Sequence, residues 1–358
     1  MNETGPRVSP VVPLDNRMLI LRSLSVLCVL LAAVATLSAS DPGMPAGSAA
    51  PPALPATPPA VTAPAPPAAI PPTDKTAGST SAALSPAEVA AQAAIAAKAT
   101  PRLRELVSRQ DALLAALGKE GADQDNVKRD IQNLVFEYDA FLRTYPTFAA
   151  GYVTYGLLLG KVGMRRESAA ILLKANQLDP DIPIVKNQLG NYLAEEGEPI
   201  EAAGYFVAAV RLAPEEPLYH YQLGTVLTEA RDDFLKSGQW SRAQLDRTMQ
   251  ESFKRAAELA PKNFAFAYRY AQSFNDLDEP NWDEALKVWG ALEDECSPGL
   301  EKETIRLQAA NILIKQKKFD HARLLLATVT AEPLKEQKQK LVAQLPPDAG
   351  KPAAAAGP

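Results

Sequence analysis

Residues 186–193 read KNQLGNYL, and the same local pattern occurs twice more in the chain. The other copies are YVTYGLLL at residues 152–159 and HYQLGTVL at residues 220–227. Each copy has a glycine at its fifth position, and these glycines follow one another at a constant 34-residue step: Gly156, Gly190 and Gly224. A fixed step of this length predicts an array of equivalent structural units, each packed on its neighbours.

Each unit has the pattern of two helices joined by a turn. A proline recurs at the same 34-residue step, and it predicts where a second helix ends because proline donates no backbone hydrogen bond. Within the second helix a smaller residue precedes a bulky one by four positions, which places both on one face. The prolines are Pro146, Pro180 and Pro214, and the pairs are Ser168/Leu172, Ala202/Phe206, Met249/Phe253, Ala285/Trp289 and Ala322/Leu326.

These features resemble the tetratricopeptide repeat (TPR), over residues 149–330 and in five units. In that family a small residue at the eighth position of a unit lets its two helices approach closely. The matching positions here are Gly156, Gly190, Gly224, Ala271 and Ala310. The resemblance implies an all-α fold, a right-handed α-solenoid of about five to six helix–turn–helix units. It also implies a surface that binds other proteins and rarely carries chemistry.

The third unit departs from the regular step. The prolines that close the second and third units are 47 positions apart, which is 13 more than 34. The additional residues fall within 228–248, where Phe234 and Leu235 predict that the first helix continues. Ser241 is expected to cap the second helix, because a serine side chain accepts a hydrogen bond from the first helical turn. Trp240 is either an anchor for a partner or, as we favour, a packing residue against the neighbouring unit.

Amphipathic helices are predicted on both sides of the array. Residues 101–117 and 125–144 each carry an apolar stripe at helical spacing, within an N-terminal region, 86–146, that is a divergent or capping repeat. The stripe of the first of these helices is Leu103, Leu106, Leu113 and Leu117. The TPR array is assigned to 147–330. Residues 331–345 predict a C-terminal capping helix with a polar outer face.

The remaining chain lacks the apolar residues of a folded domain. Residues 41–85 are almost all Pro, Ala, Ser, Thr and Gly, which predicts a disordered linker, and residues 346–358 predict a disordered tail. Residues 1–40 are expected to be a signal peptide or an N-terminal membrane anchor. Their apolar run, from Leu24 to Leu37, is shorter than the ~20 residues of a spanning helix, which favours a cleaved signal. Met18 is an alternative start to Met1.

We therefore expect a chain exported across a bacterial inner membrane, in the periplasm or associated with the envelope. The alternative is an inner-membrane anchor with the repeats outside the cytoplasm, and membrane attachment is expected only through the N-terminal segment. Without residues 1–40 the chain has 34 basic and 40 acidic residues, and its charge is −6. Because nucleic-acid binding needs a basic face, no nucleic-acid partner is expected.

No catalytic, cofactor or metal site is predicted. The two histidines lie in different repeats, His220 at a packing position of a first helix and His321 in a turn between helices, and a lone histidine of either kind is more often structural than catalytic. Beyond residue 40 the single cysteine is Cys296, and the adjacent carboxylates are expected to raise its pKa, which disfavours the reactive thiolate. The sequence contains none of the motifs HExxH, GxSxG or GxGxxG. We expect a protein that is not an enzyme.

The resemblance also implies which side chains contact a protein or extended-peptide partner. In TPR proteins the second, fifth, ninth, twelfth and thirteenth positions of the first helices line the concave face. Here that set includes amides, which pair with peptide backbone, and tyrosines, which give contact area at low entropic cost. The candidate binding residues are Val153, Leu157, Lys161, Asn187, Asn191, Tyr221, Thr225, Tyr268, Gln272 and Asn275. The alternatives are a partner on the edge or convex face, and self-association as a structural element of an envelope assembly.

Overall fold

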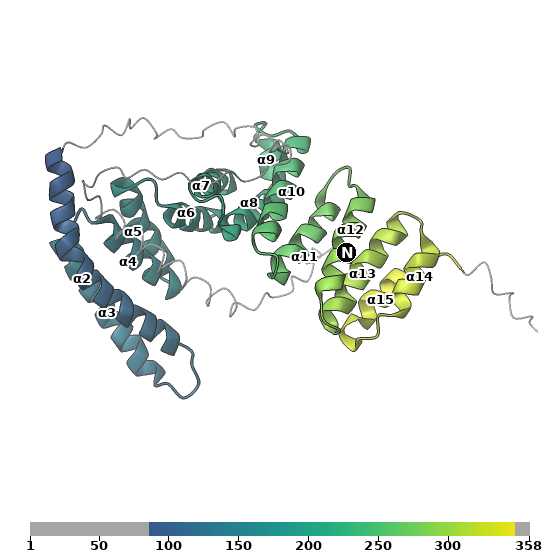
Figure 1. Cartoon of the computed structure of the whole chain (residues 1–358), viewed down its shortest axis with the longest axis horizontal. Helices are drawn as coiled ribbons and strands as arrows, with labels where there is room; N and C mark the ends of the chain where they lie inside the picture. The colour runs from purple at the N-terminus through teal and green to yellow at the C-terminus, as the bar shows by residue number, and fades with distance from the viewer. Residues whose placement is uncertain (1–85, 348–358) are drawn as a thin grey trace, which may run out of the picture. The chain divides into compact units, whose positions relative to one another are not determined.

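The computed structural model describes residues 86–347, and in that range it contains helices and turns but no strand (Figure 1). The segments predicted as signal or anchor (1–40) and linker (41–85) lie outside the described residues, as does the tail from residue 348. The helices are α2 Pro86–Ala116, α3 Gln124–Thr144, α4 Ala149–Lys161, α5 Arg165–Leu178, α6 Pro183–Glu195, α7 Pro199–Leu212, α8 Pro217–Glu229, α9 Arg231–Lys236, α10 Arg242–Leu259, α11 Phe264–Ser273, α12 Trp282–Glu295, α13 Leu300–Lys315, α14 Phe319–Ala327 and α15 Lys335–Val342, with short 3-10 helices η1 Phe274–Asp276 and η2 Glu332–Leu334.

The described residues divide into two compact units, and the boundary between them falls inside α4, after Tyr155. The first unit contains α2, α3 and the start of α4. The second contains the rest of α4 and every helix that follows. None of the helices in residues 86–347 is both long and apolar enough to cross a membrane.

In the first unit α2 packs on α3 through a buried stripe. Leu103, Leu106 and Val107 are at most 4% exposed, and the buried Tyr138 hydroxyl of α3 donates to Gln110 Oε1 at 2.8 Å. Helix α2 begins at Pro86 and runs through Pro101, so the alanine-rich residues 86–99, whose composition also allows a helix, and the predicted helix from residue 101 form one element.

The predicted apolar stripe of α2 is wrong at its end. Leu117 lies beyond the last residue of the helix and is 37% exposed. Gln110 takes the buried position nearer the middle of the helix, and its side chain is satisfied by the hydrogen bond from Tyr138.

In the second unit consecutive helices pack on one another along the chain, from α5 on α6 to α13 on α14, and α8 packs directly on α10. The predicted small residues lie where the paired helices touch. A Cβ placed on Gly190 would lie 2.9 Å from Phe206 Cε1, and one on Gly224 would lie 2.8 Å from Phe253 Cε1. A real Cβ does not approach a carbon so closely. The two contacts therefore confirm the prediction that a small residue at the eighth position lets the two helices of a unit pack together.

The same contact recurs in the other repeats with different residues. Gly156 faces Leu172, and a Cβ there would lie 2.7 Å from its Cγ. Ala271 and Ala310 are fully buried, as are Ala285 and Ala322, the smaller members of the last two predicted pairs. Their bulky partners Trp289 and Leu326 are at most 2% exposed, so the packing pattern predicted from the sequence is confirmed through the fifth unit.

The insertion in the third unit does not continue the first helix, and the prediction that it would is wrong. Helix α8 ends at Glu229, and Ala230 leaves the helical region with φ −103° and ψ 26° before the six-residue α9 begins. The predicted cap at Ser241 is confirmed: its side chain accepts from the Gln244 backbone N–H, and the Gln244 side chain accepts from the Ser241 N–H in return.

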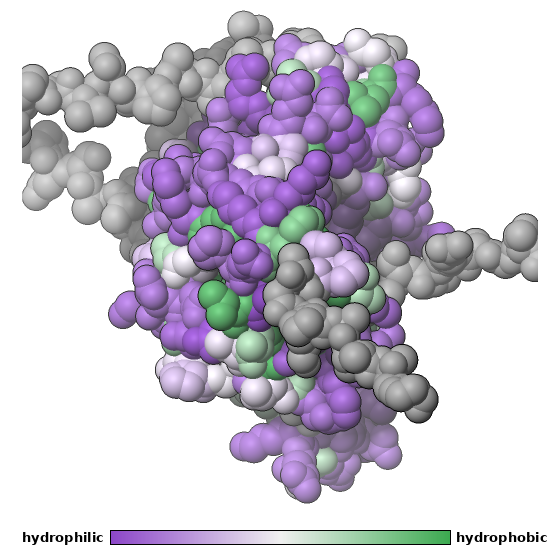
Figure 2. Space-filling view, turned by 90° about the vertical axis from the view of Figure 1, so that its right-hand side faces the viewer, coloured by the Kyte–Doolittle hydropathy of each residue, from purple (hydrophilic) through white to green (hydrophobic). Residues whose placement is uncertain are grey.

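The last helix, α15, covers the end of the array. Leu334 and Leu341 are buried against α13 and α14, while Lys335, Glu336 and Lys340 are exposed. Figure 2 views the molecule from the side on which α14 and α15 lie in Figure 1, and hydrophilic residues predominate on that face, with apolar residues in separate patches.

Candidate functional site

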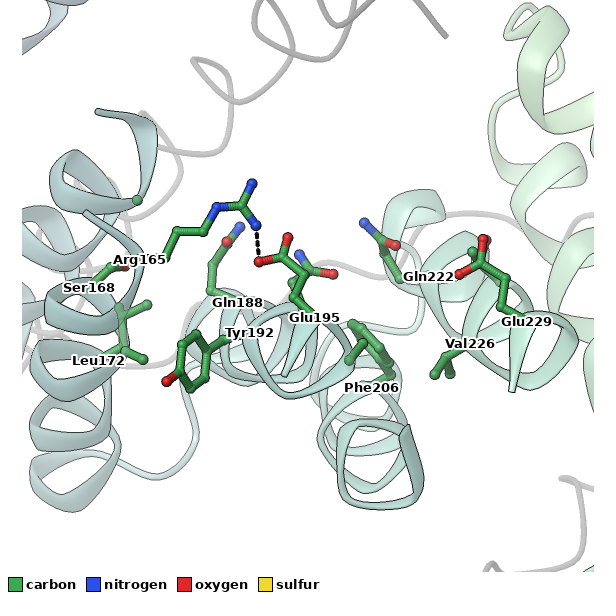
Figure 3. Close-up of a pocket in the computed structure, with 15 residues that line it drawn as sticks. Arg165, Ser168, Leu172, Gln188, Tyr192, Glu195, Phe206, Gln222, Val226 and Glu229 are labelled. Atoms are coloured by element: carbon green, nitrogen blue, oxygen red, sulfur yellow. Dashed lines mark ion pairs between the residues drawn. The ribbon is translucent and has the colours of Figure 1, made fainter. Parts of the chain in front are cut away.

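A groove of about 390 Å³ lies over α6 and α8 in the second unit, and we call it the α6–α8 groove (Figure 3). Its lining residues come from five consecutive helices, α4 to α8. The lining residues are Gly160, Arg165, Ser168, Ala169, Leu172, Gln188, Asn191, Tyr192, Ala194, Glu195, Phe206, Gln222, Thr225, Val226 and Glu229.

The polar lining repeats at the period of the sequence. Gln188 and Gln222 are separated by one 34-residue step, and so are Glu195 and Glu229. Because α6 and α8 are equivalent helices of neighbouring units, residues one period apart face the same way. In Figure 3 these four side chains point to one side of the two helices. The groove therefore offers two sets of an amide and a carboxylate, one repeat apart.

The apolar part of the lining belongs to the repeat core. Leu172, Phe206 and Val226 are 2%, 1% and 6% exposed, and Phe206 is the ring that packs against Gly190. Close packing between the helices thus holds the polar side chains above it at a fixed spacing.

The charges of the groove are only partly balanced within the protein. Arg165, the first residue of α5, forms an ion pair with Glu195, the last residue of α6 (Figure 3). Glu229, the last residue of α8, forms no ion pair with any residue of the described range 86–347. One guanidinium and two carboxylates leave the groove with an excess of one negative charge.

The candidate binding residues of the sequence fall into different environments. Asn191 and Thr225 line the α6–α8 groove. The rings of Tyr221 and Tyr268 pack edge-on against Phe253 at 5.8 Å and Trp289 at 5.1 Å between ring centres. Of the remaining residues, Val153 and Asn187 are 1% exposed, Leu157 and Asn275 are half-buried, and Lys161 and Gln272 are exposed.

Asn191 and Thr225 are the only lining residues in the sequence-based set, and the polar residues missing from it include Gln188, Gln222 and Arg165. Gln188 and Gln222 occupy the sixth position of their units, which the family pattern does not count among the inward positions. Arg165 belongs to a second helix. The sequence feature that could have identified the two glutamines is that the same amide residue recurs after one 34-residue step.

His220 and Cys296 are partly buried, whereas His321 is exposed. His220 Nε2 lies 2.8 Å from the Pro214 carbonyl oxygen, and burial lowers the pKa of this imidazole. Burial, and after it the Glu301 carboxylate, raises the pKa of the Cys296 thiol, in the predicted direction. Within residues 86–347 no three His, Cys, Asp or Glu side chains are grouped so as to hold a metal ion.

Trp240 packs inside the insertion itself. Its ring meets Phe234 of α9 edge-on at 5.8 Å between ring centres, and both contribute to the core that contains Phe206 and Phe253. The packing interpretation holds, although the neighbour in direct ring contact belongs to the same unit.

Solved structures with a similar fold include several TPR proteins. YrrB, described as a TPR protein with an unusual peptide-binding site, has a TM-score of 0.47 at 20% identity, covering 57% of this chain and 97% of its own. PilF of Pseudomonas aeruginosa has a TM-score of 0.45 at 15% identity, covering 67% and 99%. MamA of Desulfovibrio magneticus RS-1, from residue 41 on, has a TM-score of 0.41 at 16% identity, covering 54% and 96%.

No protein-family model and no curated protein matches the sequence. The assignment of the repeats therefore depends on their own features, which are the 34-residue step, the paired helices and the close contact between the eighth residue and a bulky side chain. By these features the second unit is an array of TPR-type helix–turn–helix repeats.

Proposed function

We propose that this chain is a non-catalytic scaffold that binds an extended segment of a partner protein in the α6–α8 groove. The observation that carries the proposal is the pair of glutamines, Gln188 and Gln222, at equivalent positions of neighbouring repeats. An amide side chain both donates and accepts hydrogen bonds, so it matches the N–H and C=O groups of a peptide backbone.

The size and lining of the groove are compatible with a bound ligand. A volume of about 390 Å³ lies in the range of ligand pockets, and its lining combines buried apolar carbons with a few convergent polar groups. An extended chain advances roughly 3.3 Å per residue, and packed helix axes lie roughly 8–10 Å apart, so residues about three positions apart in one segment reach the amides of α6 and α8. Asn191 and Thr225 add a second pair of polar groups at the same step.

We further propose that the scaffold acts in a bacterial cell envelope, exported or anchored through residues 1–40, with 41–85 as a tether. The support is the apolar run followed by Ser38-Ala39-Ser40 and the Pro/Ala-rich composition after it. Proteinase treatment of spheroplasts checks this location. The repeats are expected to be digested without cell lysis, whereas protection until lysis would contradict an envelope location.

Self-association is the second candidate function, and one surface favours it. Leu324 of α14 is 71% exposed, and a groove of about 460 Å³ between α14 and α15 is lined by Leu326, Val342 and Leu345 together with Arg323 and Lys338. Exposed apolar groups at the end of a repeat array favour stacking of further copies. The candidate predicts a mass that increases with protein concentration in sedimentation equilibrium and returns to the monomer in Leu324→Lys.

The peptide proposal is tested with the full chain and a phage-displayed library of random peptides. We expect the wild type to capture a set of related peptides and the double variant Gln188→Ala/Gln222→Ala to lose them at an unchanged melting temperature. The matched control is Gln337→Ala/Gln339→Ala, which removes two exposed glutamines of α15. Peptides that bind all three proteins equally, or none, would contradict the proposal.

A further inference from the structure

Glu195 and Glu229 are equivalent residues with different surroundings. One 34-residue step separates them, each is the last residue of its helix, and both line the α6–α8 groove. A carboxylate at the C-terminal end of a helix faces the negative end of the helix dipole, so each is better stabilised with a cation beside it. Glu195 has that cation in Arg165, across the groove (Figure 3).

The repeat lacks the same cation for Glu229. One period after Arg165 the chain has Pro199, and both residues are the first of their helices, α5 and α7. The position that neutralises Glu195 is therefore filled at Glu229 by a ring that carries no charge.

Arg269, which contacts the residue before Glu229, is engaged elsewhere. Arg269 of α11 donates through Nη2 to the Thr228 hydroxyl at 3.1 Å, and its Nη1 pairs with Asp276 Oδ2 at 2.9 Å. Its guanidinium carbon also lies 4.2 Å from the centre of the Phe253 ring. Packing and pairing therefore fix this guanidinium on Asp276 and Phe253, and Glu229 keeps its charge in the groove.

From this difference we propose that the bound segment carries a lysine or arginine that pairs with Glu229 at the place where the first repeat unit supplies Arg165 to Glu195. The inference rests on the proposed function, because it names the chemistry of the segment that the groove holds. The partner thus completes a charge pattern that the protein begins, and the cation fixes the position of the segment relative to Gln188 and Gln222.

The contact is expected to affect affinity and register together. Glu229 is exposed in the free chain, so the contact gains strength only where the bound segment covers it, and its loss is expected to weaken binding about fivefold. The amides of Gln188 and Gln222 are equivalent, so contacts with them alone allow the segment to bind in two positions that differ by one repeat. The unpaired carboxylate of Glu229 occurs once, so a cation that pairs with it fixes the segment in one position.

The test uses the full chain, the displayed random-peptide library and four variants, with the enrichment of Lys and Arg as the measured quantity. Wild type is expected to enrich a cation at one fixed position of the selected peptides. Glu229→Gln removes the carboxylate and Pro199→Arg neutralises it from within, so both are expected to abolish the enrichment. Arg165→Gln exposes Glu195 and is expected to add a second enriched position.

Glu201→Gln is the matched control, because Glu201 is an exposed glutamate of α7 outside the groove, and it is expected to leave the enrichment unchanged. Thermal unfolding by circular dichroism confirms that each variant is folded. If Pro199→Arg fails to fold, Glu229→Gln and Arg165→Gln still give opposite expectations.

The outcomes separate this inference from the function on which it rests. Peptides captured by wild type without a cation preference, or with a preference that survives Glu229→Gln, would overturn the cation contact while leaving peptide binding intact. Failure of wild type to capture any peptide overturns the proposed function, and the cation contact with it.

Discussion

The second repeat (α6 and α7) and the third (α8 to α10) make the same helix contact with chains of different length. Phe206 follows Gly190 by 16 positions in the sequence, whereas Phe253 follows Gly224 by 29. An added Cβ would nevertheless lie 2.9 Å from the ring in the second repeat and 2.8 Å in the third. The contact between helices is thus set by the residues that meet, and the connection between them is free to vary.

The difference in connection has a local cause. In the first two repeats a glycine with positive φ turns the chain between the helices: Gly163 at 87° and Gly197 at 85°. One period after Gly197 the chain has Arg231, which is the first residue of α9. The next glycine with positive φ is Gly238, at 70°. Since a side chain disfavours this backbone region, Arg231 does not form the turn, and the separate helix α9 begins there instead.

Ion pairs and hydrogen bonds to Asp246 hold the longer connection against α10. Asp246 of α10 accepts from Arg242 Nε at 2.9 and 3.0 Å and from the Asp278 backbone N–H at 2.9 Å. Arg231 of α9 adds an ion pair at 3.5 Å. The second repeat has no insertion and no such cluster. Comparing the two repeats therefore separates the contribution of the aromatic contact to the free energy of unfolding from the contribution of the connection.

The largest expected effect is loss of the ring itself. Phe206→Ala and Phe253→Ala each remove a ring that is at most 1% exposed, and each is expected to lower the free energy of unfolding by about 3–5 kcal/mol. Urea unfolding followed by circular dichroism measures both. Equal losses would support equivalence of the two contacts, and a loss below about 1 kcal/mol at Phe253 would show that the insertion carries the third repeat.

A smaller effect is expected from filling the space opposite the ring. Gly190→Ala and Gly224→Ala force the ring to move, which is expected to cost about 1–3 kcal/mol in each repeat. The control is Gly290→Ala in α12, where an added Cβ meets nothing within 4 Å. That change is expected to stabilise by about 0.5–1 kcal/mol through helix propensity. Destabilisation by all three would show that alanine is disfavoured for a reason other than the contact.

The smallest effect of this series is confined to the third repeat. Asp246→Ala removes the acceptor of the cluster that holds α9, and it is expected to lower stability by about 1–2 kcal/mol, since both arginines are partly exposed. Amide hydrogen exchange is expected to accelerate in α9 and at Asp278. Asp233→Ala, on the exposed side of α9, is the control. Uniform acceleration across the second repeat would contradict a role confined to the connection.

Much of the fold was predictable because repetition multiplies a weak local signal. The glycine, the proline and the bulky residue each recur, and their agreement predicted the helix pairs and the capped start of α10. Helix α9 was missed because the apolar residues Phe234 and Leu235 fit a continuing helix as well as a separate one. The decisive change was the residue at position 231, where a glycine was absent.

The groove was less predictable, because exposure depends on which neighbouring side chain fills the space. Asn191 and Thr225 lie in the groove, but the Tyr221 ring is held between Phe253 and Phe266, at 5.8 and 4.9 Å between ring centres. A substitution of Tyr221 would therefore alter the packing of the core as well as any contact with a ligand. The Arg165–Glu195 pair joins residues 30 positions apart in two units, and that distance becomes short only in the folded array.

The most direct measurement of the central claim is a double-mutant cycle between the groove and a peptide selected by the wild-type chain. Isothermal titration compares wild type and Glu229→Gln, each with the peptide and with a version whose cationic residue is replaced by norleucine. The account predicts a coupling free energy of about 1 kcal/mol or more between Glu229 and the cationic residue of the peptide. In a control cycle with Glu201→Gln as the protein variant, the coupling free energy is expected to be zero. Additive losses at Glu229 would contradict the claim that the groove recognises its ligand through this carboxylate.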